Sequence, residues 1–362
     1  MRRGLALALA AFVLLAAPRL SRLASAHLLA LDLLVPGWVP TVQSAVREPS
    51  AFDGSTADRY RPDGRPRGGL VLVPGLSRQG KNHPAFQRLA QSLARAGFLV
   101  LAPDFPGLRA FHVADGDVQM IIRAVQVLRA EGGSPTGILG FSFGAGPALL
   151  AAADPRIREQ IAIAGSFGGY WDLANVIAFI TTGWFDEDGH WRQVGQQSYN
   201  RWKLLAALVP YVENPSEGAR LQRLADRKLA NPDEDVRAEL GKLGVEGWRL
   251  LALVENQRRD RVADLLASLT PAMRERLRRL SPSAAIGQVS ARLLIAHGRD
   301  DDSIPYTESA RLARAAPNLG RLVIFDGFTH AFPSEGGWRS RLRQARDLER
   351  LVLLLDALLA RQ

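Results

Sequence analysis

The stretch GILGFSFGAG, from Gly137 to Gly146, contains the pattern G-x-S-x-G. It places Ser142 between glycines at positions 140 and 144, with apolar residues before it and small residues after it. The pattern G-x-S-x-G is typical of a serine on a sharp turn between a strand and a helix. The same short pattern arises by chance in glycine-rich chains, where the serine only fills a bend. The surrounding sequence has to decide between these interpretations.

Short apolar runs alternate with amphipathic segments along most of the chain. We predict strands within 69–75, 98–104, 136–142, 160–165, 291–298 and 321–327, with helices between them. Continuously apolar strands separated by helices predict an α/β fold, a mostly parallel, doubly wound sheet covered on both faces. Ser142 therefore has a strand before it and a helix after it, at the carboxyl edge where such sheets bind ligands.

Two segments depart from this alternation. Between residues 170 and 286 the pattern is helical throughout, which predicts a helical lid inserted between adjacent strands of the core. The core would then comprise residues 41–169 and 287–362. Residues 41–68 are weakly patterned, and we expect an edge hairpin around Asp63-Gly64.

A serine nucleophile needs a base, and the base needs an orienting carboxylate. His330 follows the last predicted strand, in LVIFDGFTH. Asp300, Asp301 and Asp302 follow the preceding strand, in HGRDDDSIP. The order Ser, Asp, His, each in a loop after a separate strand, is the order found in α/β-hydrolases and differs from those of chymotrypsin and subtilisin.

From Gly69 to its end the chain resembles the α/β-hydrolases of the serine esterase and lipase group, through LVPG, GFSFG, HGRDDDSIP and GFTH. The resemblance implies that Ser142 is the nucleophile and His330 the base. In that family the acid lies three residues after the glycine of a G-x-x-D-x-x-[VI]-P loop, which selects Asp301. Asp300 or Asp302 would then cap the next helix.

The resemblance also implies an oxyanion hole. The family uses the N–H of the residue after the nucleophile, here Phe143, and an N–H after the first strand, here Leu76. The sequence departs from the family at Pro74, where a histidine is common before the glycine.

Composition excludes several other chemistries. The chain has no cysteine, so disulfides, thiolate zinc sites and a cysteine nucleophile are ruled out. The six histidines are scattered without metal-ligand spacing, and no dinucleotide or phosphate loop occurs, so we expect no metal and no cofactor. The net charge of +10 comes mostly from arginine, without a basic stripe interleaved with aromatics, and we expect no nucleic-acid partner.

Residues 1–40 are expected to form a signal peptide or a membrane-anchoring segment. Arg2 and Arg3 precede an apolar run that continues to Ala17, and ASA at 24–26 offers a cleavage site. A cleaved signal, a retained anchor, an amphipathic surface helix and a helix packed on the domain compete as interpretations. We favour export or membrane attachment, hence a location in the cell envelope.

The expected function is hydrolysis of a small-molecule carboxylic ester through an acyl-enzyme, with Ser142, His330 and Asp301 as the triad. A serine peptidase like the prolyl oligopeptidases would use the same three loops. A non-catalytic binding protein on a hydrolase fold is a further alternative, although such proteins usually lose triad members. The natural substrate, the choice of ester, thioester or amide, and the oligomeric state stay open.

Overall fold

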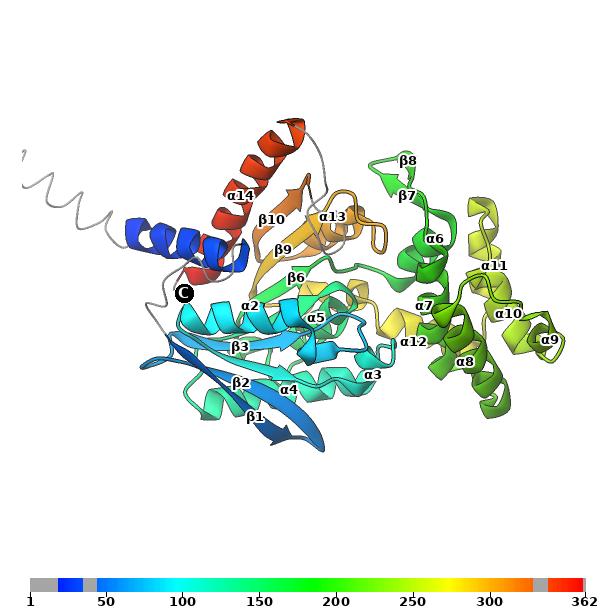
Figure 1. Cartoon of the computed structure of the whole chain (residues 1–362), viewed down its shortest axis with the longest axis horizontal. Helices are drawn as coiled ribbons and strands as arrows, with labels where there is room; N and C mark the ends of the chain where they lie inside the picture. The colour runs from blue at the N-terminus through cyan, green and yellow to red at the C-terminus, as the bar shows by residue number, and fades with distance from the viewer. Residues whose placement is uncertain (1–18, 35–43, 328–337, 361–362) are drawn as a thin grey trace, which may run out of the picture.

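The computed structural model describes residues 19–34, 44–327 and 338–360. An eight-stranded sheet has helices on both faces, and a separate group of helices lies to one side of it (Figure 1). The strand order is β1-β2-β4-β3-β5-β6-β9-β10. β2 is antiparallel to both of its neighbours, and the other neighbouring strands are parallel. The predicted mostly parallel sheet is confirmed.

Apart from the edge hairpin of residues 45–62, the strands coincide with the apolar runs of the sequence. β3 and β4 are buried along their whole length, as expected of central strands covered on both faces. The strands of the sheet are β1 Ala45–Phe52, β2 Ser55–Pro62, β3 Gly68–Val73, β4 Phe98–Pro103, β5 Thr136–Phe141, β6 Ile161–Phe167, β9 Arg292–Gly298 and β10 Leu319–Phe325.

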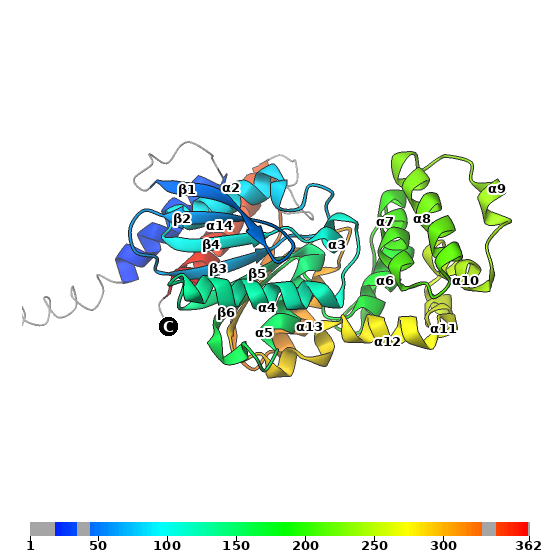
Figure 2. The ribbon, with the colours of Figure 1, turned by 90° about the horizontal axis from the view of Figure 1, so that it is seen from below.

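Two hydrophobic layers stabilise the sheet, one on each face. Alternate residues of β3 separate between them, because successive side chains of a strand point to opposite faces. α2 and α14 cover one face, whereas α4, α5 and α13 cover the other; Figure 2 shows the first four of these helices on their two sides. The core helices are α2 Pro84–Arg95, α3 Pro106–Arg109, α4 Asp115–Ala130, α5 Ala145–Ala152, α13 Tyr306–Ala315 and α14 Trp338–Leu359.

The edge hairpin exists, but the expected position of its turn was wrong. β1 and β2 pair with Phe52 opposite Ser55, so the turn is Asp53-Gly54. Both turn residues have positive φ, 50° and 75°, as a two-residue hairpin turn requires. The Asp63-Gly64 pair comes after β2 instead. Two Asp-Gly pairs of equal local strength occur close together, and only strand pairing distinguishes them.

The lid, residues 170–286, connects β6 to β9, which are adjacent in the sheet. Its buried residues belong to the same hydrophobic cluster as those of the α4 and α5 layer, so its interior continues the core. The lid helices are α6 Leu173–Thr182, α7 Ser198–Leu208, α8 Pro215–Ala230, α9 Arg237–Leu240, α10 Val245–Val254, α11 Val262–Ser268 and α12 Pro271–Arg279.

The lid is not helical throughout. β7 Trp184–Glu187 and β8 His190–Gln193 form a small antiparallel hairpin that turns at Asp188-Gly189. Both turn residues again have positive φ, 51° and 86°. The expectation of an all-helical insertion was wrong because strands this short leave little periodicity in a sequence.

Residues 19–34 form a helix that packs on the domain beside α2 and α14. Ala26, Leu29 and Ala30 are buried there. Arg22 forms an ion pair with Asp356 of α14, and Asp32 forms one with Arg95 of α2. Of the four interpretations, the structure shows for residues 19–34 the helix that packs on the domain. The rest of the predicted segment before Pro40 lies outside the described residues. No helix in the described part of the chain is long and apolar enough to cross a membrane.

Candidate active site

Ser142 lies where the sequence predicts, between β5 and the short 3-10 helix Ser142–Gly144 that leads into α5. Its φ is 51°, a left-handed conformation that non-glycine residues rarely adopt. Strain of this kind concentrates at functional sites, where the surrounding structure enforces it. The strand–turn–helix context that the serine motif requires is therefore present.

The glycines of the motif are needed for close backbone contacts. A Cβ on Gly144 would lie 2.1 Å from the carbonyl oxygen of Pro74, and one on Gly140 would lie 2.5 Å from the Cα of Ala145. Such distances are far below van der Waals contact, so neither position accepts a side chain without a shift of the backbone. The spacing of the motif thus reflects a turn pressed against the end of β3.

The two predicted oxyanion residues flank this turn. A Cβ on Gly75 would lie 2.8 Å from the Cβ of Ser142 and 3.4 Å from its Oγ, so the loop after β3 runs directly beside the serine. Leu76 follows Gly75 in that loop, and Phe143 follows Ser142 at the start of the helical segment. In the structure, the two backbone segments that carry the predicted N–H groups therefore lie next to Ser142.

Asp301 lies in the loop after β9 and is 2% exposed. Its Oδ1 accepts hydrogen bonds from the backbone N–H groups of Ser303 at 2.8 Å and Ile304 at 2.9 Å. These bonds fix the orientation of the carboxylate, because they hold one oxygen in a tight turn. Of the three consecutive aspartates, Asp301 is the one that points inward.

The neighbouring aspartates do not cap the next helix, as one of them was expected to do. α13 follows Pro305, and no side chain caps its start. Asp300 is exposed, whereas Asp302 accepts a hydrogen bond from Gln197 of the lid at 3.0 Å. The expectation was wrong because the proline that precedes the helix takes the cap position itself.

His297 contacts the loop after β9 that contains Asp301, called here the acid loop. Its ring is buried at the end of β9, with Nε2 2.9 Å from the carbonyl oxygen of Ile304 and 3.3 Å from Asp301 Oδ2. Since a carbonyl oxygen only accepts, Nε2 carries the proton and Nδ1 accepts from the Ser309 hydroxyl, 2.7 Å away. The imidazole links α13 to the loop and so has the structural role expected of it at a strand end.

A cavity of about 460 Å³ opens between these elements. Ser142, Leu76 and Asp301 all line it, together with apolar side chains such as Phe86 and Phe167. His330, the predicted base, lies outside the described residues, so its assignment stays a prediction. The structure therefore brings together Ser142, Asp301 and Leu76, three of the predicted site residues, at a single cavity.

Two further side chains of the cavity, those of His83 and Lys203, are not among the predicted catalytic or oxyanion residues. His83 lines the cavity, and its Nδ1 accepts a hydrogen bond from Ala85 N–H at the start of α2. Lys203 of α7 also lines it, and sequence reasoning missed this residue. Its only sequence signal is that a lysine occurs in a chain whose positive charge is mostly arginine.

No group of three or more histidine, aspartate and glutamate residues in the described ranges could hold a metal ion.

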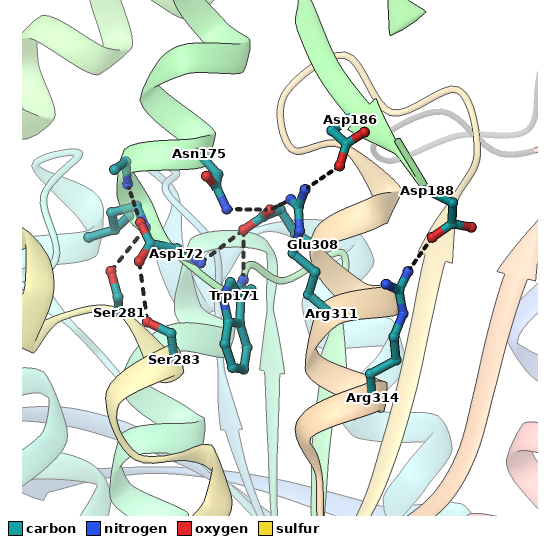
Figure 3. Close-up of polar contacts among 12 residues, drawn as sticks. Trp171, Asp172, Asn175, Asp186, Asp188, Ser281, Ser283, Glu308, Arg311 and Arg314 are labelled. Carbon is teal, nitrogen blue, oxygen red and sulfur yellow. Dashed lines mark hydrogen bonds and ion pairs between the residues drawn. The ribbon is translucent and has the colours of Figure 1, made fainter. Parts of the chain in front are cut away.

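The start of the lid is tied to the core beside the acid loop. Glu308 of α13 is fully buried and accepts hydrogen bonds from the backbone N–H groups of Trp171 at 3.0 Å and Asp172 at 2.9 Å. Asn175 and Arg311 bind its other oxygen (Figure 3). Burial raises the pKa of the Glu308 carboxyl, whereas these donors oppose the rise.

The last residues of the lid contact its first residues. Ser281 accepts a hydrogen bond from Leu173 N–H at 3.0 Å, and the buried Tyr170 hydroxyl donates to the carbonyl oxygen of Leu280 at 3.0 Å. Figure 3 shows Ser281 and Ser283 next to Asp172, opposite the Glu308 cluster. Both ends of the lid are therefore anchored to each other and to the helix that follows Asp301.

Comparison with known proteins gives a family match. The sequence profile described as "Alpha/beta hydrolase family" matches residues 70–336, which include every predicted site residue. No curated protein sequence matches the chain.

Several solved structures are similar to the chain at low identity. Pyrococcus horikoshii acylaminoacyl peptidase is 16% identical with a TM-score of 0.46, over 80% of this chain and 38% of that one. 2,6-Dihydroxy-pseudo-oxynicotine hydrolase is 18% identical with a TM-score of 0.45, over 87% and 68%. A Mycobacterium tuberculosis puromycin-hydrolyzing peptidase is 17% identical with a TM-score of 0.49, over 86% and 39%. The chain thus spans well under half the length of both peptidases.

Proposed function

The chain belongs to the alpha/beta hydrolase family, and within it we propose a serine hydrolase that cleaves a carboxylic ester of a small molecule. Ser142 is the nucleophile, His330 the general base and Asp301 the acid that orients the imidazole. The observation that supports this most strongly is the left-handed φ of Ser142 on a turn that lines a cavity shared with Asp301. A serine that only filled a bend would not need that strain.

The proposed reaction has two halves. The Ser142 Oγ forms a bond to the carbonyl carbon while His330 takes the hydroxyl proton, and the alcohol then leaves with that proton as the C–O bond breaks. Water attacks the acyl group next, again losing its proton to His330, which returns it to Ser142 as the carboxylic acid leaves. The Phe143 and Leu76 N–H groups stabilise the oxyanion in both halves.

Labelling with a fluorophosphonate, which reacts with activated serines, tests the proposal. We expect the intact protein to be labelled and Ser142→Ala to be spared, with aryl-ester hydrolysis reduced roughly 10³-fold or more. Equal labelling of both proteins would overturn the nucleophile assignment. Comparison of aryl esters with peptide anilides then separates an esterase from a peptidase, since we expect faster turnover of the esters.

We also propose that the N-terminal helix contacts a membrane surface. Residues 19–34 bury one side on the domain, whereas Leu20 and Leu28 on the other side are 65% and 52% exposed. Exposed leucines beside arginines are typical of helices that lie on anionic lipid. The full chain should float with anionic vesicles and Leu20→Ser/Leu28→Ser should float less, whereas Val245→Ser, a change at an exposed valine of the lid, should behave like the wild type. Equal flotation of all three would refute the contact.

A further inference from the structure

One wall of the site cavity carries a cation that the proposed hydrolysis does not use. Lys203 lies on α7, so the lid brings this side chain to the cavity that Ser142 and Asp301 line from the core. Among the described residues that line the cavity, it is the one lysine or arginine. Most of the other lining residues are apolar or glycine, so its charge is conspicuous to any ligand that enters.

Lys203 is held in place without a charged partner in the described part of the chain. Its Nζ makes no hydrogen bond or ion pair there, and lies 6.0 Å from the ring centre of Phe111 and 5.5 Å from that of Tyr199. Burial lowers the pKa of its ammonium group, and the charges of Asp302 and Asp301 oppose this. A cation kept partly out of water without a close counter-ion is stabilised when an anion binds beside it.

The two nearby carboxylates are engaged elsewhere. Asp301 Oδ1 accepts hydrogen bonds from two backbone N–H groups of its own loop, and its Oδ2 lies 3.3 Å from His297 Nε2. The Asp302 side chain accepts from Gln197, and its carbonyl oxygen accepts from Asn200 at 3.2 Å. These contacts hold both carboxylates in the loop after β9. The ammonium group of Lys203 is therefore available to a ligand in the cavity.

A second cation approaches the same aromatic ring. The guanidinium carbon of Arg78, in the exposed loop after β3, lies 5.8 Å from the ring centre of Phe111. Phe111 itself has a φ of 63°, an outlier for a bulky residue. Two cations therefore share one strained, buried aromatic residue at the boundary between the lid and the core.

We propose that Lys203 binds an anionic group of the substrate, so that the natural substrates are esters that carry a carboxylate or a similar anion besides the bond that is cleaved. The inference rests on the proposed function of Ser142 and names the substrate class of that site. Lys203 selects by charge and takes no part in the transfer of protons. Arg78 does not line the cavity, so its charge acts on the bound anion only at longer range.

The test uses matched pairs of esters with the full-length protein. One pair comprises mono-4-nitrophenyl esters of dicarboxylic acids of increasing length and the same esters with the free carboxylate replaced by a carboxamide. The other pair comprises 4-acyloxybenzoates and the corresponding benzamides. The first pair places the anion on the acyl side and the second on the leaving-group side. The measured quantity is the ratio of kcat/KM for the anionic ester to that for its neutral partner.

We expect the wild type to prefer the anionic member of at least one pair, and Lys203→Met to lower that ratio about 10-fold or more. Lys203→Arg should recover part of the preference. Lys228→Met is the matched control, because Lys228 also lies over a ring of the lid, 5.3 Å from Trp202, but does not line the cavity. Its ratio should equal that of the wild type.

The outcomes separate this inference from the proposed function. Lys203→Met should keep both its fluorophosphonate labelling and its activity on the neutral esters. A wild type that is labelled at Ser142 but has equal kcat/KM for both members of every pair would overturn the role of Lys203 alone. A ratio that falls equally in Lys203→Met and Lys228→Met would overturn it as well. A wild type that hydrolyses no ester and is not labelled would refute the proposed function instead.

Discussion

The turn after β5 and the lid are stabilised in different ways. At the turn, backbone lies against backbone: a Cβ on Gly144 or Gly75 would overlap neighbouring atoms. The lid is held by apolar side chains along its helices and by a few polar contacts at its two ends, such as that between Glu308 and the backbone of Asp172. The turn therefore tolerates almost no change of residue, whereas the lid can change its sequence and keep its shape.

The largest difference in stability and activity between the turn and the lid is expected when a single methyl group is added to a glycine. Gly144→Ala would bring a Cβ to 2.1 Å from the Pro74 carbonyl oxygen, so the turn has to move. We expect this variant to lose about 3 kcal/mol or more of unfolding free energy and almost all esterase activity. Urea unfolding and an aryl-ester assay measure both effects.

The matched control places the same methyl group in the lid. Gly241 has an ordinary φ of -60°, and a Cβ there would meet no atom within 4 Å. Gly241→Ala should therefore be as stable as the wild type or more stable by about 0.5 kcal/mol. Similar losses in both glycine variants would contradict the contrast between the turn and the lid.

A second prediction concerns the surface between the lid and α4. Asp117 lies at the start of α4, where its Oδ2 accepts from Ala114 N–H at 2.8 Å, and the nearby Tyr211 hydroxyl of the lid donates to Val113. Burial raises the pKa of Asp117 to about 6. Because the pKa is raised in the folded state, its contribution to stability is present below about pH 4 and is lost as the pH rises through 6.

Asp117→Asn keeps the acceptor for Ala114 and removes the titration. We expect this variant to be more stable than the wild type at pH 8, by up to about 3 kcal/mol, and by a smaller margin at pH 5. Urea unfolding of both proteins at the two pH values gives the difference. If the stability difference between Asp117→Asn and the wild type stayed constant or shrank from pH 5 to pH 8, the pKa of the Asp117 carboxyl would not be raised in this way.

The smallest effect is expected at the nucleophile itself. Glycine adopts a positive φ without strain, so Ser142→Gly should raise the unfolding free energy by about 1 kcal/mol while abolishing activity. Ser142→Ala is the control, because alanine keeps the strain and lacks the hydroxyl as glycine does, so Ser142→Gly should be the more stable of the two. If the two variants were equally stable, the turn would store no strain at position 142.

The sequence predicts those parts of the molecule that depend on local rules. The order of apolar strands and helices and the serine turn follow from spacing and residue type, whereas the choice of Asp301 among the three aspartates of HGRDDDSIP came from the resemblance to the α/β-hydrolases. The hairpin turn at Asp53-Gly54 does not, because an equal turn signal stands at Asp63-Gly64. The positions of Glu308 and Lys203 could not be predicted either, since both depend on how the lid docks on the core. Long-range packing of this kind leaves no periodic trace in a single sequence.

We propose that Ser142, Asp301 and His330 converge around one oxyanion site. A crystal structure of the protein phosphonylated by a fluorophosphonate would show whether they do. We predict phosphorus on Ser142 Oγ, a phosphonyl oxygen within hydrogen-bond distance of the Phe143 and Leu76 N–H groups, and the His330 imidazole between Asp301 and the phosphonate. Phosphorus on another residue, or His330 directed away from both, would contradict it.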